Sequence, residues 1–115
     1  MAQECLFCRI IANEIPSEVI YQDEDFLAFR DIEPQAPTHL IIVPKTHIPS
    51  LAELTEQQRG LIGRLIILAQ KLAEKEAIAQ RGFRLAINSG PEGGQVIPHL
   101  HFHLIGGRKL SDQLG

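Results

Sequence analysis

The chain has little cysteine, no basic excess and no long hydrophobic run, and each absence argues against a class of protein. Two cysteines are too few for a disulfide-dense secreted scaffold. The 11 basic residues are outnumbered by 14 acidic ones, so the chain lacks the basic surface of a general nucleic-acid binder. The longest apolar run, residues 65–69, is too short to cross a bilayer, and no secretory leader is recognisable. We therefore expect a cytoplasmic protein with neither a nucleic-acid partner nor a membrane partner.

The length and composition favour one globular domain over residues 1–115. An apolar fraction of 44% supports a packed core, and we find no repeat, low-complexity tract or linker. The early patterns predict a short helical segment over 8–16, a β-hairpin over 18–31 and a buried strand over 38–44.

One long amphipathic helix is predicted over about residues 55–79. Thr55 and Gln58 fit a capping box at its start, and Gly82 supplies a stop signal. Its apolar stripe recurs at helical spacing and consists of Leu61, Ile62, Leu65, Ile66, Leu68, Ala69, Leu72 and Ala73. Two further strands are expected over 82–88, with Phe83, Leu85 and Ile87 inward, and over 99–105. Strands around one long helix indicate an α+β domain with a mainly antiparallel sheet.

The last predicted strand, "HLHFHLI", carries three of the chain's five histidines. Side chains alternate along a strand, so His99, His101 and His103 should share one face while the leucines and phenylalanine between them share the other. The three rings are expected to bind a metal, act on a ligand, or form a solvated face. Three ligands from one straight strand converge poorly on a single ion, so divided roles are preferred.

A glycine-rich segment precedes this strand and favours chemistry at phosphorus. Gly90, Gly93 and Gly94 allow backbone N–H groups to approach an anion closely, and Asn88 offers an amide beside them. An ordinary connecting loop is the alternative reading of the glycines alone. Beside a phosphate, an unprotonated imidazole is a competent nucleophile near neutral pH.

The two cysteines form a C-x-x-C pair, Cys5 and Cys8. Such a pair is redox-active, metal-binding or unpaired, and no thioredoxin-like strand and helix pattern accompanies it. A closed zinc site needs about four ligands, so the pair alone leaves these alternatives open.

The segments "PTHLIIVPKTHI" and "NSGPEGGQVIPHLHFHLIGGR" resemble the histidine triad (HIT) superfamily. The "GGR" after the triad and "DIEPQAPTH" upstream are similar to the Hint branch, the nucleoside phosphoramidate hydrolases. The resemblance runs from about Cys5 to Arg108. It implies a five-stranded sheet with one long helix and a short N-terminal helix, continued across a homodimer. It also implies hydrolysis of the P–N bond of purine nucleoside phosphoramidates, with no cofactor for catalysis.

The resemblance implies a role for each matching residue. His101 would attack the α-phosphorus and form a nucleotidyl-histidine, His103 would contact the phosphate and help with protons, and His39 would lie nearby. Asp31 would accept hydrogen bonds from the ribose hydroxyls. The remaining nucleotide-binding residues would hold the phosphate (Asn88, Gly94, Gln95 and Val96) or line a purine pocket (Phe7, Ile10, Phe29 and Ile32).

The resemblance also implies partners for the cysteines. Several bacterial members hold a structural zinc, and the matching residues here are Cys5, Cys8, His47 and His99. Such a Cys₂His₂ set suits a closed tetrahedral site. The alternative is a pair of reduced, buried thiols beside a hydrogen-bonding His99.

Two departures from the family pattern affect the expected function. Val96 stands where many members carry Ser or Thr, so a phosphate contact there must come from the backbone. The tail "KLSDQLG" lacks the tryptophan of animal members, and this bears on the leaving group. The rival hypotheses are a purine nucleotide-binding module with vestigial hydrolysis, a zinc hydrolase using the triad as ligands, and a dinucleoside polyphosphate hydrolase of the same superfamily.

Overall fold

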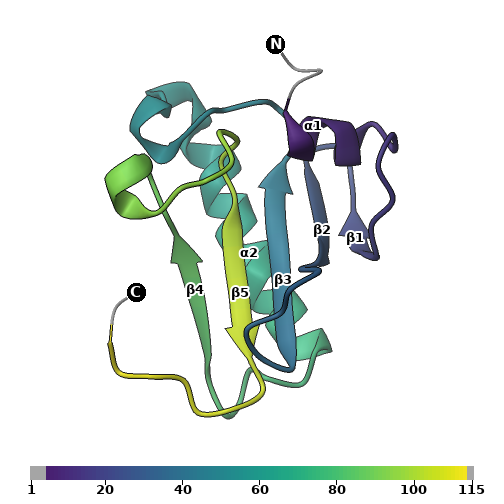
Figure 1. Ribbon diagram of the computed structural model, residues 1–115, viewed down its shortest axis with the longest axis vertical. Coiled ribbons are helices and arrows are strands. Elements are labelled where there is room, and N and C mark those ends of the chain that lie inside the picture. Colours follow the sequence, from purple (N-terminus) through teal and green to yellow (C-terminus); the bar gives the residue numbers. More distant parts are fainter. Residues whose placement is uncertain (1–4, 114–115) are drawn as a thin grey trace.

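The computed structural model describes residues 5–113 (Figure 1). Five strands form one antiparallel sheet in the order β1-β2-β3-β5-β4. The strands are β1 (Val19–Gln22), β2 (Phe26–Arg30), β3 (Thr38–Pro44), β4 (Phe83–Ile87) and β5 (Phe102–Gly106). The helices are α1 (Leu6–Ile11) and α2 (Arg59–Lys75), with short 3₁₀ turns at Leu51–Glu53, Glu56–Gln58 and Pro91–Gly93. The α+β class and the mainly antiparallel sheet are confirmed.

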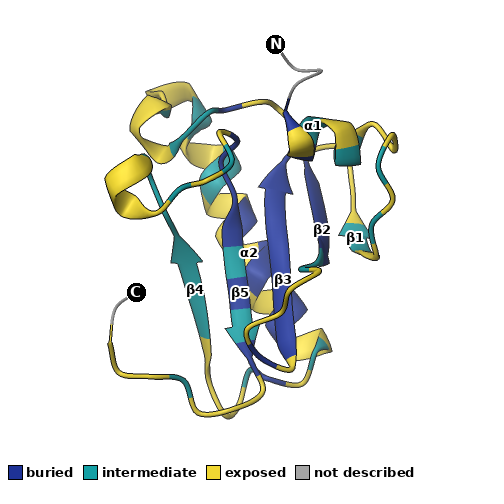
Figure 2. Ribbon diagram, viewed as in Figure 1, coloured by how far each residue is buried: buried dark blue, intermediate teal, exposed yellow. Residues whose placement is uncertain are grey.

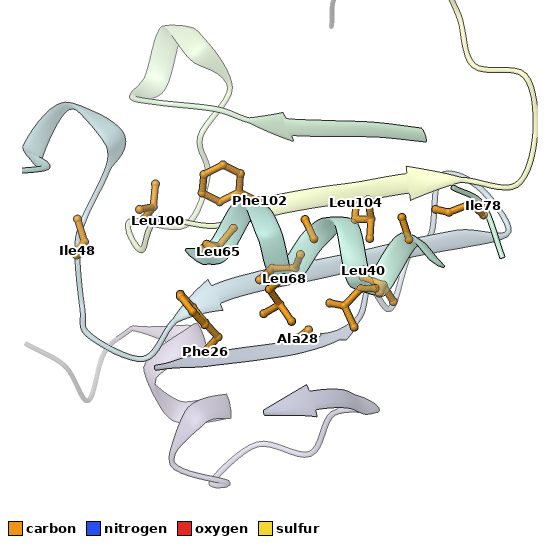
Figure 3. Close-up of a cluster of buried hydrophobic side chains, with 14 residues drawn as sticks. Phe26, Ala28, Leu40, Ile48, Leu65, Leu68, Ile78, Leu100, Phe102 and Leu104 are labelled. Carbon is orange, nitrogen blue, oxygen red and sulfur yellow. The ribbon is translucent and has the colours of Figure 1, made fainter. Parts of the chain in front are cut away.

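The sheet separates a large core from a smaller apolar cluster. On one face, α2 packs Leu65, Leu68 and Leu72 against apolar side chains of β2, β3 and β5 (Figure 3). On the other face, α1 covers a cluster that includes Phe7, Phe29 and other buried residues of β2 and β3. The central strand β3 is buried along its whole length because both faces are covered (Figure 2).

Both predicted helices have different bounds from those expected. The first ends at Ile11 rather than near residue 16, because Asn13 takes a left-handed conformation with φ 63°. The long helix is preceded by a 3₁₀ turn, in which Gln58 Oε1 accepts the Thr55 N–H at 3.0 Å. It ends well before Gly82, since Ala77 is left-handed with φ 61° and Ile78 N–H donates to Ala73 O. This Schellman-type end lets Ile78 turn back into the core.

Two strand predictions also need correction. The last strand begins at Phe102 rather than residue 99, because Leu100 N–H donates to Ile48 O of a loop, at 2.6 Å. Phe83 is not inward but 39% exposed at the start of the edge strand β4, whereas Leu85 and Ile87 do pack against the core. Of the predicted helical stripe, Ile66 is 47% exposed. Among the described residues, no helix combines the length and apolar character needed to cross a membrane.

Candidate active site

A cavity of about 530 Å³ lies beside α1, on the face of the sheet opposite α2. This volume suits a small-molecule ligand. Its walls come from α1 and the segment after it, from β2 and the turn that follows, from the glycine-rich loop and from β5. The lining residues are Leu6, Phe7, Ile10, Ile15, Pro16, Ser17, Phe29, Arg30, Asp31, Ile32, Glu33, Ile41, Asn88, Gly94, Val96, Ile97, His101 and His103.

The three histidines share one face of the sheet, as the alternation predicts. His99 and His101 are buried, at 0% and 7% exposure, so the trio is not a solvated face. The intervening Leu100, Phe102 and Leu104 point into the core beneath α2 (Figure 3). His101 and His103 line the cavity, whereas His99 lies against the two cysteines.

One hydrogen bond shows which ring nitrogen of His101 carries the proton and which has the free lone pair. Its Nδ1 lies 2.7 Å from the carbonyl oxygen of His99, and a carbonyl only accepts, so Nδ1 carries the proton. Burial lowers the pKa of His101 below its ordinary value, which keeps the ring neutral near pH 7. The unprotonated Nε2 is therefore available as a nucleophile or base.

His103 has the opposite tautomer, set through His39. The backbone N–H of Gln35 donates to His39 Nδ1 at 3.0 Å, so the neutral ring of His39 carries its proton on Nε2. That Nε2 lies 2.9 Å from His103 Nδ1, which must accept, leaving the His103 proton on Nε2. Burial, then repulsion from the rings of His101 and His39, lowers the pKa of His103 to about 4. Two neutral imidazoles with ring centroids 5.1 Å apart thus differ at Nε2: His101 has a lone pair there, and His103 has an N–H.

Asp31 follows β2 and lies beside His39. Its Oδ2 is 3.4 Å from His39 Nε2, and its Oδ1 accepts the backbone N–H of Glu33 at 2.8 Å. The carboxylate weakens the effect of burial on His39, whose pKa is still lowered overall. Asp31 also lines the cavity, so it can accept hydrogen bonds from a ligand.

The glycine-rich loop brings Asn88 and Gly94 together at the cavity. Gly94 has φ 87°, and a Cβ there would lie 3.6 Å from Asn88 Nδ2. Val96 also lines the cavity and is 88% exposed. Gln95 does not line it: its side chain amide donates to Pro49 O and Ile97 O, and its Oε1 accepts from Gly90 N–H. The Gln95 side chain therefore holds the shape of the loop.

The four residues expected to line a purine pocket all lie on the cavity wall. Phe7 and Phe29 make an edge contact with ring centroids 5.7 Å apart, and Phe7 makes another with His101 at 4.9 Å. Ile10 is half-buried beside them, whereas Ile32 is 93% exposed at the rim. An apolar wall with an open rim suits a flat base that enters from solvent.

A second cluster joins Cys5, Cys8, His47 and His99, whose donor atoms all lie within 4.8 Å of one another. The His99 Nδ1 is 3.3 Å from Cys5 Sγ, 3.5 Å from Cys8 Sγ and 3.2 Å from His47 Nδ1. Four ligands about 2.0–2.3 Å from one zinc ion would be roughly 3.3–3.8 Å apart, so the set fits a tetrahedral site closely. His99 Nε2 donates to Pro44 O at 2.9 Å, which leaves Nδ1 free to coordinate.

The Cys8 thiol of this cluster is protonated when no cation is bound. Burial, followed by the hydrogen bond and charge of Cys5, raises the pKa of Cys8 to about 11. A bound divalent cation reverses this effect, because the thiolate is the form that coordinates. The cluster therefore has the donor set and the geometry of a structural metal site.

A larger cavity, of about 970 Å³, lies on the α2 side between that helix and the β1–β2 turn. Its described lining has no histidine or cysteine and includes the glycines of α2 and several exposed charged side chains. The groups able to do chemistry thus gather on the α1 face of the sheet.

Some contributors to the site were not predicted from the sequence. Gln35 contributes only its backbone N–H, and the carbonyls of His99 and Pro44 orient two imidazoles. Residue types do not reveal such contributions, because every residue except proline has the same backbone groups. The pocket residues Leu6, Ile15, Pro16, Ser17, Arg30, Glu33, Ile41 and Ile97 were also missed.

Comparisons with known proteins agree with this geometry. The chain is 47% identical over 114 residues to the purine nucleoside phosphoramidase of Escherichia coli K12, covering 99% of this chain and 96% of that protein. It is 44% identical over 108 residues to adenylylsulfatase HINT1 of Arabidopsis thaliana, covering 92% of this chain and 73% of that protein. The crystal structure of a HIT family hydrolase from Legionella pneumophila superimposes with a TM-score of 0.95 and 45% identity, over 97% of this chain and 100% of the other.

The sequence model of the HIT domain matches residues 12–110. The matched residues begin just before the cavity-lining segment that follows α1, and they include the strand that carries His103. Relatives at more than 40% identity cover nearly the full length of the chain. The chain belongs to the HIT domain family.

Proposed function

We propose that this protein hydrolyses the P–N bond of purine nucleoside phosphoramidates, with His101 as the nucleophile. The observation that carries the proposal is the pair of opposite tautomers at the cavity wall: His101 with a free Nε2 and His103 with an Nε2–H. One ring can attack an electrophile while its neighbour donates to it. The similarity to the phosphoramidase of Escherichia coli supports the choice of substrate.

In the first step, His101 Nε2 forms a bond to the α-phosphorus and the P–N bond breaks. The amine leaves with the electron pair of that bond and takes up a proton from solvent. The Nε2–H of His103 can donate to a phosphate oxygen as its negative charge grows. Asn88 and the backbone at Gly94 would hold the other oxygens, with the Gln95 side chain keeping the loop in shape.

In the second step, water attacks the same phosphorus and the His101 Nε2–P bond breaks. The water proton is released, the imidazole regains its neutral form and a nucleoside monophosphate leaves. Dividing the reaction into two displacements is the advantage of a covalent intermediate. The chemistry uses only side chains and backbone of this chain, so no cofactor is required for it.

The nucleoside would be bound by other residues that line the same cavity. A carboxylate can accept from both hydroxyls of a ribose, and Asp31 lines the cavity where β2 ends. The base would lie against Phe7, Ile10, Phe29 and Ile32. His39 acts through His103 rather than through substrate contact, since its Nε2 is engaged by that ring.

The cysteine–histidine cluster is proposed to hold a structural zinc. Zinc bound there would tie α1 to the segment before β5, because Cys5 and Cys8 come from the first and His99 from the second. The triad itself does not suit a three-histidine catalytic site. His99 Nδ1 faces the cysteines, and His101 Nδ1 is taken by a carbonyl.

A homodimer is the oligomeric state we propose. The strand β4 lies at an edge of the sheet, and an edge strand is an available site for pairing with a second sheet. Large apolar side chains are exposed on both elements: Phe83 on β4, and Ile66 and Ile67 on α2. Pairing of two copies through this edge would extend the sheet.

Replacement of the nucleophile gives the direct test of the proposed function. In His101→Ala, turnover of an adenosine phosphoramidate should fall by at least about a thousandfold, while the Kd for AMP changes by less than about threefold. The matched control is Arg59→Ala, because Arg59 is exposed on α2 and pairs with Glu56. Full hydrolysis by His101→Ala would contradict the mechanism. Saturable binding by the unmodified protein without any product would favour the nucleotide-binding module instead.

A further inference from the structure

The Gly106-Gly107-Arg108 turn begins with the last residue of β5 and has no part in the steps above. It is the "GGR" segment that follows the histidine triad in the sequence. Gly106 is buried, while Gly107 and Arg108 are exposed. Gly107 and Arg108 contact the segment that leads to His39, and none of the three residues lines the cavity.

The two glycines allow the turn to pack directly against its neighbours. A Cβ on Gly106 would lie 2.8 Å from Ile78 Cδ1, and one on Gly107 would lie 3.0 Å from Pro37 Cβ. Gly107 also has φ 96°, a conformation that side chains disfavour. Gly106 therefore lies against the core at Ile78, and Gly107 lies against Pro37 in the segment that connects Asp31 to His39.

Arg108 reaches the same segment by a hydrogen bond. Its Nη2 donates to the carbonyl oxygen of Gln35 at 2.7 Å, and its Nη1 donates to Lys109 O at 3.1 Å. Gln35 is also the residue whose N–H donates to His39 Nδ1 at 3.0 Å. The guanidinium thus fixes the position of the residue that sets the His39 tautomer.

We propose that Arg108 is a positioning residue that, by holding Gln35, keeps the protons of His39 and His103 on their Nε2 atoms. If Gln35 moves away, His39 Nδ1 loses its donor, and part of the population can carry the proton on Nδ1 although the Asp31 carboxylate, 3.4 Å from Nε2, still favours a proton there. His39 Nε2 then accepts, His103 donates from Nδ1, and His103 Nε2 presents a lone pair. A lone pair there would repel phosphate oxygens, whereas an N–H attracts them.

The catalytic consequence rests on the proposed function, but the positioning itself does not. The segment has other supports, since Glu33 N–H donates to Asp31 and the Gln35 side chain donates to Glu33 O. Loss of the guanidinium should therefore misplace Gln35 without unfolding the turn. We expect kcat to fall about tenfold and KM to change by less than about twofold, because the contact acts on the transition state.

The experiment reads the tautomers directly. Protein labelled with ¹⁵N-histidine would be examined at neutral pH by long-range ¹H–¹⁵N spectra, which report the protonated nitrogen of each ring. Arg108→Met keeps an aliphatic stem and removes the donors, Arg108→Lys restores one charged donor, and Arg59→Ala is the matched control. Kinetics with an adenosine phosphoramidate would be measured on the same samples.

The unmodified protein and Arg59→Ala should show His39 and His103 protonated on Nε2 and His101 protonated on Nδ1. Arg108→Met should move part of the His39 and His103 population to Nδ1–H, and Arg108→Lys should return most of it. Unchanged tautomers in Arg108→Met would overturn the proposal, even if activity fell. Altered tautomers in a protein whose unmodified form hydrolyses nothing would support the positioning role and remove the proposed function.

Discussion

At the scale of single residues, two backbone groups give identical side chains different functions. The carbonyl of His99 places the His101 proton on Nδ1, and the N–H of Gln35 places the proton of His103 on Nε2 through His39. A carbonyl cannot donate and an N–H cannot accept, so neither assignment depends on charge or pH while the rings stay neutral. The site is thus organised before any ligand arrives.

Replacing the Asp31 carboxylate should affect the sugar preference more than the chemistry. Asp31→Asn keeps an oxygen for the Glu33 N–H but loses one ionised acceptor for the ribose hydroxyls. The unmodified protein should bind AMP about tenfold more tightly than 2′-deoxy-AMP, and the variant should lose most of that difference. Calorimetric titration of both ligands measures it.

The control for this prediction is Asp25→Asn, which removes an exposed carboxylate beside Arg64 on the other side of the molecule. It should bind both ligands as the unmodified protein does. An Asp31→Asn protein that still prefers the ribonucleotide tenfold would show that the ribose is recognised elsewhere.

The side chains that gather at the cavity and in the cysteine–histidine cluster were predictable from the sequence, but their hydrogen-bond partners were not. Alternation in "HLHFHLI" is enough to place the three histidines on one face, and the structure bears this out. The separate position of His99 among the cysteines follows from the resemblance rather than from periodicity. The tautomers depend on backbone groups of residues 35 and 99, which no residue-type pattern encodes.

At the scale of elements, α1 is the part of the cavity wall with the least support of its own. It has six residues, too few for a stable isolated helix, yet it supplies Leu6, Phe7 and Ile10 to the cavity. Its N-cap is Cys5, whose sulfur accepts the Cys8 N–H at 3.3 Å. The cysteine–histidine cluster therefore stands at the point where α1 joins the rest of the fold.

Removal of the metal should loosen α1 and weaken nucleotide binding. Metal analysis should find about one zinc per chain, and Cys8→Ser or a strong chelator should lower Tm by at least about 5 °C and raise KM. The control is the chelator added to Cys8→Ser, which should cause little further change. A zinc-loaded protein whose Tm and KM are unaffected by chelation would show that the cluster does not support the wall.

Element types were predicted better than element ends. The hairpin, the buried strand and the amphipathic helix all follow from periodicity, and each is present. The helix ends differ because Asn13 and Ala77, rather than a glycine, take the left-handed conformation. Burial of Ile78 stabilises the fold and opposes the conformational cost of the left-handed Ala77. Tertiary packing of this kind cannot be recognised in a local sequence pattern.

At the scale of the whole molecule, burial of four histidines links stability to pH. Burial is the largest cause of the lowered pKa at His39, His99, His101 and His103. In the unfolded chain the histidines have ordinary pKa values near 6.5. Below that pH, the unfolded chain therefore binds more protons than the folded chain. The free energy of unfolding should therefore fall as the pH falls from about 6.5 toward 4.

The contribution of His103 can be isolated with His103→Asn. Its pKa of about 4 when folded means that it accounts for stability present above pH 6.5 and lost progressively down to about pH 4. The slope of the unfolding free energy between these limits should be shallower in the variant by up to about 1.4 kcal/mol per pH unit. Urea titrations at several pH values give both slopes, and equal slopes would show that folding does not lower the pKa of His103.

The sheet also divides the molecule by function. One face packs against α2 and supplies most of the apolar core, while the other holds the cavity and the cysteine–histidine cluster. Substitutions beneath α2 should therefore act on stability, and substitutions beneath α1 on chemistry.

Covalent catalysis by His101 is the central step of the proposed reaction. The direct measurement is to mix the protein with an adenosine phosphoramidate, quench within milliseconds and map the modified peptide by mass spectrometry. We expect an adenylyl group on the peptide that contains residues 99–103, attached to His101 and absent from His101→Ala. Rapid product formation with no adduct at any time, or an adduct on another residue, would contradict the account.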